Sequence, residues 1–272
     1  MNKGKKIGLG KSAEVFCWGS SQVIKLFYAN ISTACIEYET KVTQTIYQAG
    51  LSVPRVQGIV LVDERKGIVS DRIMGDSMLN SIRLKPWKIF YFARLLAKLQ
   101  TKIHQCDAPQ LIPLRQQRQL QIKGVKALPE IQKQVILNLL DRLPIGKSLC
   151  HGDFHPGNVI LSASGCVAID WPNAVRGHSH ADVARTLLLL VAGETPTNLT
   201  SIPWLLFRIL FGAIYLQHYL KLNRLTLEQI CPWLLPEAAA WLSHCSSGQE
   251  QKSLLFIIER LLKNQYIINS YA

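Results

Sequence analysis

The chain has 272 residues, of which 48% are hydrophobic and 18% are charged. These proportions exclude an intrinsically disordered or collagen-like chain and favour a globular protein rich in buried helices. The formal net charge of +13 suits an anionic partner such as a nucleotide. The basic residues form no dense block, so the sequence does not favour binding to nucleic acid.

Cysteine spacing and the longest apolar stretch indicate the cellular compartment of the protein. Seven cysteines are scattered along the chain without a Cys-x-x-Cys pair. This pattern predicts reduced thiols in a cytoplasmic protein rather than a disulfide framework or a zinc knuckle. The stretch from Ile202 to Leu220 is interrupted by Arg208, Gln217 and His218. We therefore expect a buried helix there and no transmembrane segment. The oligomeric state stays open.

The first 74 residues predict a small antiparallel sheet with one helix. Alternating and apolar runs predict strands at Lys6–Gly10, Ala13–Trp18, Gln22–Phe27, near Arg55–Val62 and at Gly67–Ile73. Asn30 is expected to cap a helix that ends at Gly50. Residues 71–74 would then connect this part to the rest of the chain.

Helical patterns dominate after Gly75. Helices are predicted at Trp87–Cys106, Pro129–Leu143, Asp182–Ala192, Pro203–Leu220, Leu227–Cys245 and Lys252–Ile268. Between the second and third of these, residues 159–161 and 167–169 predict a hairpin with polar residues at its ends. We expect an α+β protein with an N-terminal part at 1–74 and a helical part at 75–272.

The strongest chemical signal is the run from His151 to Asn158, followed by Asp170 at the end of the next apolar stretch. Phosphoryl transfer needs a carboxylate to receive a hydroxyl proton and oxygen ligands to hold magnesium against phosphates. Asp153 and Asn158 have the spacing of the base and the metal-binding amide in the kinase catalytic loop. Asp170 falls where a second metal ligand is needed.

These residues, with Ile169-Asp170-Trp171, resemble the aminoglycoside phosphotransferase and choline kinase family of small-molecule kinases. The resemblance implies a protein-kinase-like fold of two lobes, with ATP and Mg²⁺ as cofactors. It also implies site roles: Asp153 as the catalytic base, Asn158 and Asp170 as magnesium ligands, and His151 as the scaffold of the catalytic loop. His155 and Asp182 would give structural support, Asp182 by bracing the loop from the start of a helix.

The N-terminal lobe is then expected to bind the nucleotide. Gly8, Gly10 and Ser12 lie in a glycine turn whose backbone amides can approach phosphate, and Lys25 can neutralise phosphate charge. Ala13 stands where the kinase pattern has its third glycine. The connection that contains Asp71 and Ile73 is expected to meet the adenine edge.

Lys25 needs a carboxylate partner from the following helix. At 100° per residue, Glu39 shares a face with Val42 and Ile46, whereas Glu37 falls on the polar face. We therefore expect Glu39 to point inward toward Lys25 and Glu37 to point outward.

Two alternatives remain open at this stage. A metal-dependent hydrolase could assemble a zinc or two-metal site from the His and Asp cluster, which comprises His151, Asp153, His155, Asp170, His178 and His180. A pseudokinase would keep the fold as a binding module without the chemistry.

The acceptor is expected to be a small molecule that carries a hydroxyl group and is neutral or anionic. After Asp182 the sequence offers only five glutamates and no aspartate, while the net charge is +13. A polycationic acceptor would need a site rich in carboxylates, so the charge balance disfavours one.

Overall fold

The structure is a computed structural model, and it describes residues 3–193, 202–245 and 248–270. The chain divides into two compact units. Unit 1 comprises Met1–Leu84 and Pro156–Ala174, and unit 2 comprises Lys85–His155 and Val175–Ala272. The α+β class, with an antiparallel sheet in the N-terminal part and a mainly helical remainder, is as predicted. The assignment of lobe functions to residues 1–74 and 75–272 stays a prediction.

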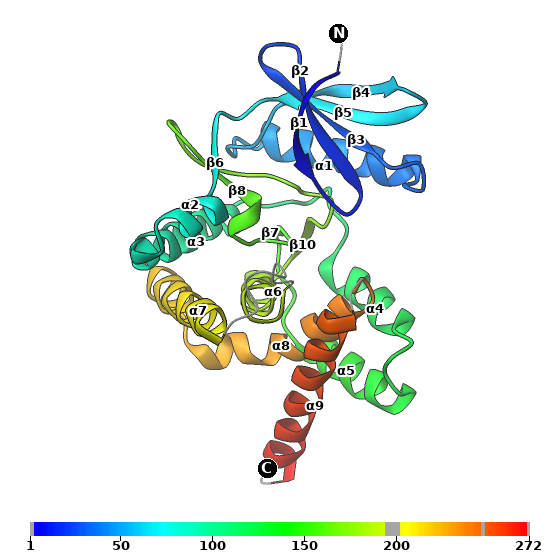
Figure 1. Ribbon diagram of the computed structural model, residues 1–272. Helices are drawn as coiled ribbons and strands as arrows, with labels where there is room; N and C mark the ends of the chain where they lie inside the picture. Colours follow the sequence, from blue (N-terminus) through cyan, green and yellow to red (C-terminus); the bar gives the residue numbers. More distant parts are fainter. Residues whose placement is uncertain (1–2, 194–201, 246–247, 271–272) are drawn as a thin grey trace. The chain divides into compact units, whose positions relative to one another are not determined.

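Unit 1 is built on a five-stranded antiparallel sheet (Figure 1). Its strands are β1 (Lys3–Leu9), β2 (Ala13–Trp18), β3 (Gln22–Phe27), β4 (Val56–Val62) and β5 (Arg65–Asp71). Their order across the sheet is β1-β2-β3-β5-β4. Ile24 and Leu26 of the central strand β3 are fully buried among Phe16, Trp18 and Val69. All five strands predicted from the sequence are present.

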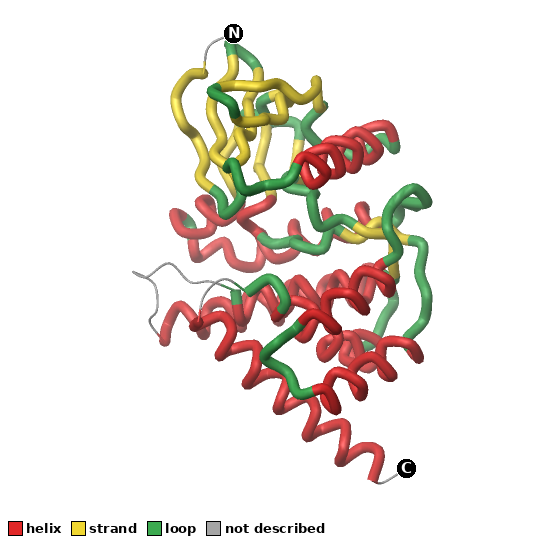
Figure 2. Tube along the Cα trace, turned by 90° about the vertical axis from the view of Figure 1, so that its right-hand side faces the viewer, coloured by secondary structure: helices red, strands yellow, loops and turns green. Residues whose placement is uncertain are grey.

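Helix α1 (Thr33–Gln48) lies beside this sheet, as Figure 2 shows. Ile36 of the helix packs with Phe27 and Ile68 of the strands, which buries the apolar face of α1. The cap of this helix differs from the prediction: Ser32, and not Asn30, is the N-cap, and its hydroxyl accepts a hydrogen bond from the Cys35 amide. Two acceptable capping residues lie close together here, and the sequence alone does not rank them.

A second, three-stranded sheet in unit 1 joins segments that are far apart in the sequence. Its strands are β6 (Gly75–Ser77), β8 (Val159–Ser162) and β9 (Gly165–Ala168), in the order β6-β8-β9. The β8–β9 hairpin is as predicted. Strand β6 and helix α2 (Met78–Leu84) were not predicted, because elements this short carry little periodic signal.

Unit 2 is mainly helical (Figure 1). Its elements are η1 (Pro86–Lys88), α3 (Ile89–His104), α4 (Leu114–Gly124), α5 (Glu130–Arg142), β7 (Ser148–Cys150), β10 (Val175–Gly177), α6 (Ser179–Ala192), α7 (Ile202–Asn223), α8 (Leu227–Leu242) and α9 (Gly248–Ser270). Helix α6 packs against both α7 and α8, so it is central to the unit. The six predicted helices are present, and α6 starts at Ser179 rather than at Asp182.

All seven cysteines are free thiols. Within residues 3–193, 202–245 and 248–270, no helix combines the length and the apolar character that crossing a bilayer requires.

Gly75 is required where β6 pairs with β8. Its φ is 152°, and a Cβ atom added there would lie 2.2 Å from the carbonyl oxygen of Leu161. We expect Gly75→Ala to lower the free energy of unfolding by about 1–3 kcal/mol, because the backbone of a paired strand must shift. Gly124→Ala is the control, since a Cβ atom there meets nothing within 4 Å. Equal urea midpoints for wild type and Gly75→Ala would show that the strand adapts without cost.

Candidate active site

Lys25 lies at the centre of the candidate site in unit 1. Its ammonium group, Nζ, lies 2.6 Å from Oε1 of Glu39 and 2.6 Å from Oδ1 of Asp170. Strand β3 supplies the lysine, α1 supplies Glu39, and the segment after β9 supplies Asp170. One cation thus joins three segments of unit 1.

Burial and charge act in opposite directions on Lys25. Burial is the largest single influence and lowers the pKa of Lys25, but the charges of Asp170 and Glu39 and their hydrogen bonds outweigh it. The net effect raises the pKa of Lys25 above its ordinary value, so the ammonium stays protonated at neutral pH. Burial also raises the pKa of Glu39, against the attraction of Lys25.

The predicted phase of α1 is confirmed. Glu39 is buried and bonds to Lys25, whereas Glu37 is exposed. The sequence did not predict that Asp170 would contact the same ammonium group. That contact joins two segments 145 residues apart and leaves no local pattern in the sequence.

The β8–β9 hairpin brings the two predicted metal ligands to one end. The Ile169 amide donates to the Asn158 carbonyl over 3.0 Å, so Asn158 lies directly across from the residue that precedes Asp170. Asp170 has a φ of 68°, a left-handed conformation that is uncommon outside glycine but accessible to aspartate. The residue after it is firmly fixed, because Trp171 is buried and its Nε1 donates to the Ala168 carbonyl.

The glycine turn connects β1 to β2. The Gly10 amide donates to the Ala13 carbonyl over 2.9 Å, and the Ser12 carbonyl accepts from the Tyr28 amide. Gly8 pairs with Val15, and a Cβ atom at Gly8 would lie 3.2 Å from the Cβ of Val15. The turn is therefore tight. The contacts predicted from Gly8, Gly10 and Ser12 to nucleotide phosphates stay predictions.

The connection after β5 is anchored by its own hydrogen bonds. The Asp71 carboxylate accepts from the Gln57 side-chain amide over 2.8 Å, and the Arg72 amide donates to the Ser21 carbonyl. These contacts fix the path of the backbone up to Ile73. The adenine contacts predicted for Asp71 and Ile73 stay predictions.

Residues His151–His155 of unit 2 follow strand β7, and we call them the catalytic-loop segment after their predicted role. His151 is fully buried, its ring packs against Phe154, and its Nδ1 accepts a hydrogen bond from the Asp153 amide over 3.3 Å. The Asp153 side chain keeps 28% of its surface exposed, and Nε2 of His155 lies 3.9 Å from its Oδ2. The buried His151 ring thus holds the backbone of the loop, while the Asp153 carboxylate remains accessible to solvent.

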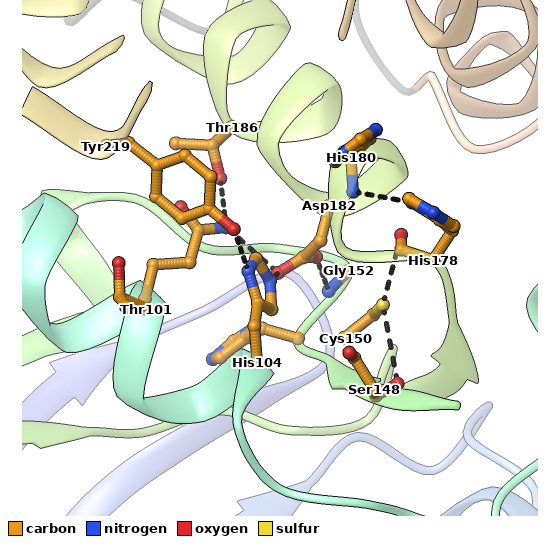
Figure 3. Close-up of polar contacts among 12 residues, drawn as sticks. Thr101, His104, Ser148, Cys150, Gly152, His178, His180, Asp182, Thr186 and Tyr219 are labelled. Carbon is orange, nitrogen blue, oxygen red and sulfur yellow. Dashed lines mark hydrogen bonds and ion pairs between the residues drawn. The ribbon is translucent and has the colours of Figure 1, made fainter. Parts of the chain in front are cut away.

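Asp182 holds the same loop from helix α6, as Figure 3 shows. Its Oδ1 accepts from the Gly152 amide over 2.7 Å, and its Oδ2 accepts from Nε2 of Gln100 at 2.9 Å and lies 3.0 Å from Nε2 of His104. Gly152 has a φ of 77°, which suits a glycine and turns its amide toward the carboxylate. The loop geometry thus depends on one buried carboxylate.

Asp182 is ionised in spite of its burial. Burial alone would raise the pKa of Asp182, but the hydrogen bond and charge of His104, the charge of His151 and the hydrogen bond from Gln100 hold this pKa well below its ordinary value. The other ring nitrogen of His104, Nδ1, lies 2.6 Å from the Tyr219 hydroxyl. The sequence analysis missed Gln100 and His104, although two polar residues four apart on the buried face of α3 were a usable signal.

The donor set of the hairpin fits magnesium better than zinc. Magnesium prefers oxygen ligands and commonly takes only one or two from the protein, and the Asn158 amide and the Asp170 carboxylate supply oxygens. Across the part of the chain that the structure describes, no group of three or more His, Cys, Asp or Glu side chains could hold a metal ion.

A family model described as the phosphotransferase enzyme family, APH, matches residues 23–225. The chain belongs to this family. The matched region contains Lys25, Glu39, the catalytic-loop segment and Asp182. A comparison with curated protein sequences finds no match.

Solved structures of similar fold include several phosphotransferases. A thermostable mutant of the aminoglycoside phosphotransferase APH(4)-Ia has a TM-score of 0.67 at 14% identity, covering 96% of this chain and 94% of its own. An amicoumacin kinase in complex with AMP-PNP, Ca²⁺ and Ami has a TM-score of 0.63 at 17% identity, with coverages of 96% and 88%. A choline/ethanolamine kinase family protein from Mesorhizobium loti has a TM-score of 0.62 at 15% identity, with coverages of 95% and 87%. The predicted kinase-like fold is confirmed.

Removal of the Asp182 charge should destabilise unit 2. We expect Asp182→Asn to lower the free energy of unfolding at pH 7 by about 2–4 kcal/mol, because the substitution removes a buried charge that accepts hydrogen bonds from several donors. A carboxyl group with a lowered folded-state pKa stabilises the fold above its unfolded pKa of about 3.9, and this contribution is lost as the pH falls further. The difference between variant and wild type should therefore narrow below about pH 4.

Urea unfolding between pH 7 and pH 3 measures this effect. Asp141→Asn is the control, because Asp141 is exposed on α5. A stability difference for Asp182→Asn that does not change with pH would contradict an ionised Asp182.

Proposed function

We propose that the protein is an ATP-dependent phosphotransferase that moves the γ-phosphate to a hydroxyl group of a small-molecule acceptor in the cytoplasm. The observation that carries this proposal is the Lys25 ammonium, held 2.6 Å from both Glu39 and Asp170. In the kinase mechanism, a lysine on the third strand pairs with a helix glutamate and binds phosphates, and an aspartate beyond the catalytic loop binds the metal. This arrangement supports the same roles for Lys25, Glu39 and Asp170.

The nucleotide is proposed to bind to unit 1. The backbone of the turn at Gly8, Gly10 and Ser12 covers the phosphates, Lys25 neutralises them, and Glu39 fixes the lysine. The backbone between Asp71 and Ile73 receives the adenine edge. The hydrogen bonds that hold the turn and the connection after β5 support the assignment, because they give each segment a defined backbone path.

Asp153 is proposed as the base that takes the proton from the acceptor hydroxyl. Magnesium, when bound with ATP, neutralises the phosphate oxygens. Asn158 and Asp170 hold it through side-chain oxygens. His151, His155 and Asp182 position the loop, since the buried His151 ring bonds the Asp153 amide and Asp182 bonds the Gly152 amide. The two successive amides of Gly152 and Asp153 are thereby held, which fixes the backbone that leads into Asp153.

The acceptor is proposed to be neutral or anionic. Similar solved structures include aminoglycoside phosphotransferases and a choline/ethanolamine kinase family protein. The compounds in these names, aminoglycosides, choline and ethanolamine, are cations. In unit 2 of this chain, Glu237 is fully buried and both of its carboxylate oxygens accept from Nε of Arg118. Glu259 pairs with Lys263. The buried Glu237 is therefore already engaged by Arg118 inside the protein.

Asp153→Asn and Asp170→Ala should separate catalysis from metal-dependent binding. Loss of the base should slow transfer by about 10²–10⁴-fold and leave nucleotide affinity unchanged. Loss of Asp170 should abolish the magnesium dependence of nucleotide affinity, because a charged metal ligand is removed. Calorimetric titration of AMP-PNP with and without Mg²⁺, together with ATP turnover, measures both effects. Unchanged turnover in Asp153→Asn would refute the base assignment, and wild-type protein without turnover on any acceptor would favour a pseudokinase.

Glu39 and Glu37 form a matched pair on one helix. Glu39→Ala should raise the Michaelis constant for ATP or lower turnover, since Lys25 loses a buried partner at 2.6 Å. Glu37→Ala, at an exposed position two residues away, should behave like wild type. Steady-state kinetics in ATP compares the two variants. Equal effects would show that the Lys25–Glu39 pair has no part in nucleotide use.

A panel of acceptors tests the charge argument. We expect phosphorylation of a neutral or anionic alcohol and poor turnover of polycationic aminoglycosides. The panel comprises aminoglycosides, choline, ethanolamine, thiamine, sugars and homoserine, assayed by ATP consumption at moderate salt. A catalytic efficiency above about 10⁴ M⁻¹s⁻¹ on a kanamycin- or neomycin-type compound, usual for a true substrate, would overturn the expectation.

A further inference from the structure

Large apolar side chains are exposed on one surface of unit 2, formed by η1, α3 and α7. We call it the α3–α7 face. Its exposed apolar members are Trp87, Phe90, Tyr91, Leu205, Leu206, Ile209 and Leu210. Trp87 keeps 72% of its surface accessible and Leu206 keeps 60%. A concentration of exposed aromatic and aliphatic residues marks an interaction surface, whereas single exposed residues do not.

Two hydrogen bonds fix the register between α3 and α7. The Tyr215 hydroxyl donates to Oε1 of Gln100, and the Tyr219 hydroxyl bonds to Nδ1 of His104. Both partners advance by four residues, so the two helices run parallel. They lie side by side in Figure 1. Their N-terminal ends therefore lie together. The exposed apolar residues of 87–91 and 205–210 therefore lie at the same end of the helix pair.

The charges on this face have a single sign. The exposed cations on these elements, and on the residue that precedes η1, are Lys85, Lys88, Arg94, Lys98, Lys102 and Lys221. Neither α3 nor α7 contains an aspartate or a glutamate. Along α3, Trp87, Tyr91, Arg94 and Lys98 follow one another at helical spacing, so the cations continue the stripe that the aromatic residues begin.

The lowered pKa of His218 is consistent with this clustering of cations. Burial lowers the pKa of His218, and so do the charges of Arg94, Lys98 and Lys221. Cations from both helices therefore act on one point between them. Arg208 of α7 is excluded from the set, because its guanidinium group donates to the carbonyls of Leu189, Leu190 and Gly193.

We propose that the α3–α7 face docks on the surface of an anionic lipid bilayer. Trp87, Phe90 and Tyr91, with the exposed leucines and isoleucine of α7, enter the boundary between headgroups and acyl chains. The surrounding lysines and Arg94 contact lipid phosphates and carboxylates. Aromatic residues with basic neighbours are the usual composition of helices that lie in this interface. Basic residues near such a surface strengthen binding through attraction to the anionic headgroups.

The same observations disfavour a second copy of the chain as the occupant. A symmetric dimer through this face would bring two sets of six like charges together without a carboxylate from either helix. The proposal also differs from membrane insertion, since no described helix is able to span a bilayer. The protein would lie on the membrane, with the Asp153 loop and the Lys25 site contributing no residue to the contact.

Sedimentation of the full-length protein with vesicles tests the proposal. The vesicles contain phosphatidylcholine alone or phosphatidylcholine with phosphatidylserine. We expect the wild type to bind the anionic vesicles and not the neutral ones. Lys88→Glu/Lys98→Glu should reduce the partition coefficient by about tenfold or more. Trp87→Ser/Leu206→Ser should reduce it while leaving the thermal midpoint close to that of the wild type, because both positions are exposed.

Matched variants elsewhere distinguish a specific face from the overall charge of +13. Lys41→Glu/Lys252→Glu changes the net charge equally at exposed positions on α1 and α9, and Ile131→Ser/Ile145→Ser removes apolar side chains that are exposed elsewhere in unit 2. Both controls should bind like the wild type. The proposal is overturned if the two charge variants lose binding equally, if Trp87→Ser/Leu206→Ser binds like wild type, or if anionic vesicles do not bind, which would favour an acidic protein as the partner of this face.

Discussion

The geometry of unit 2 around the catalytic-loop segment depends on keeping a carboxylate charged inside the protein. Asp182 has 1% of its surface exposed, and an ion in such a place is stable only when donors satisfy it. The Gly152 amide, Gln100 and His104 provide these donors from two different segments. Asp182 therefore connects the loop, α3 and α6. If any of the three shifted, the buried carboxylate would lose a hydrogen-bond donor.

Unit 1 contains the opposite case, a partly buried cation. Lys25 is held by Glu39 and Asp170, which give it two negative partners for one positive charge. The two carboxylates outnumber the single ammonium group, so the cluster carries a surplus of negative charge. The metal ion proposed to bind Asn158 and Asp170 would be attracted by this surplus.

The sequence predicted those parts of the fold and site whose signals are local. Strand and helix periodicity located the five-stranded sheet and six of the helices, and the helical phase distinguished Glu39 from Glu37. The spacing of Asp153, Asn158 and Asp170 indicated the chemistry, but their roles stay predictions. Contacts between segments that are distant in the sequence could not be predicted from it. Lys25 meets Asp170, and His104 meets Asp182, through tertiary packing that no window of sequence contains. Short elements such as β6 and β10 depend on their partners for stability and so carry little signal of their own.

The pairing of β6 with β8 has a consequence for how the chain acquires its fold during synthesis. Unit 1 needs residues 156–174, so the ribosome must complete more than seventy intervening residues of unit 2 before the second sheet can close. The Lys25–Glu39 pair can form early, since both residues precede the first break, but Asp170 joins it only after the catalytic-loop segment has been made. Contacts of such long sequence separation form late and slowly. The charge cluster on the nascent N-terminal sheet therefore stays incomplete until residues 156–174 have been synthesised. Asp170 and Asn158 then reach unit 1 in the same step.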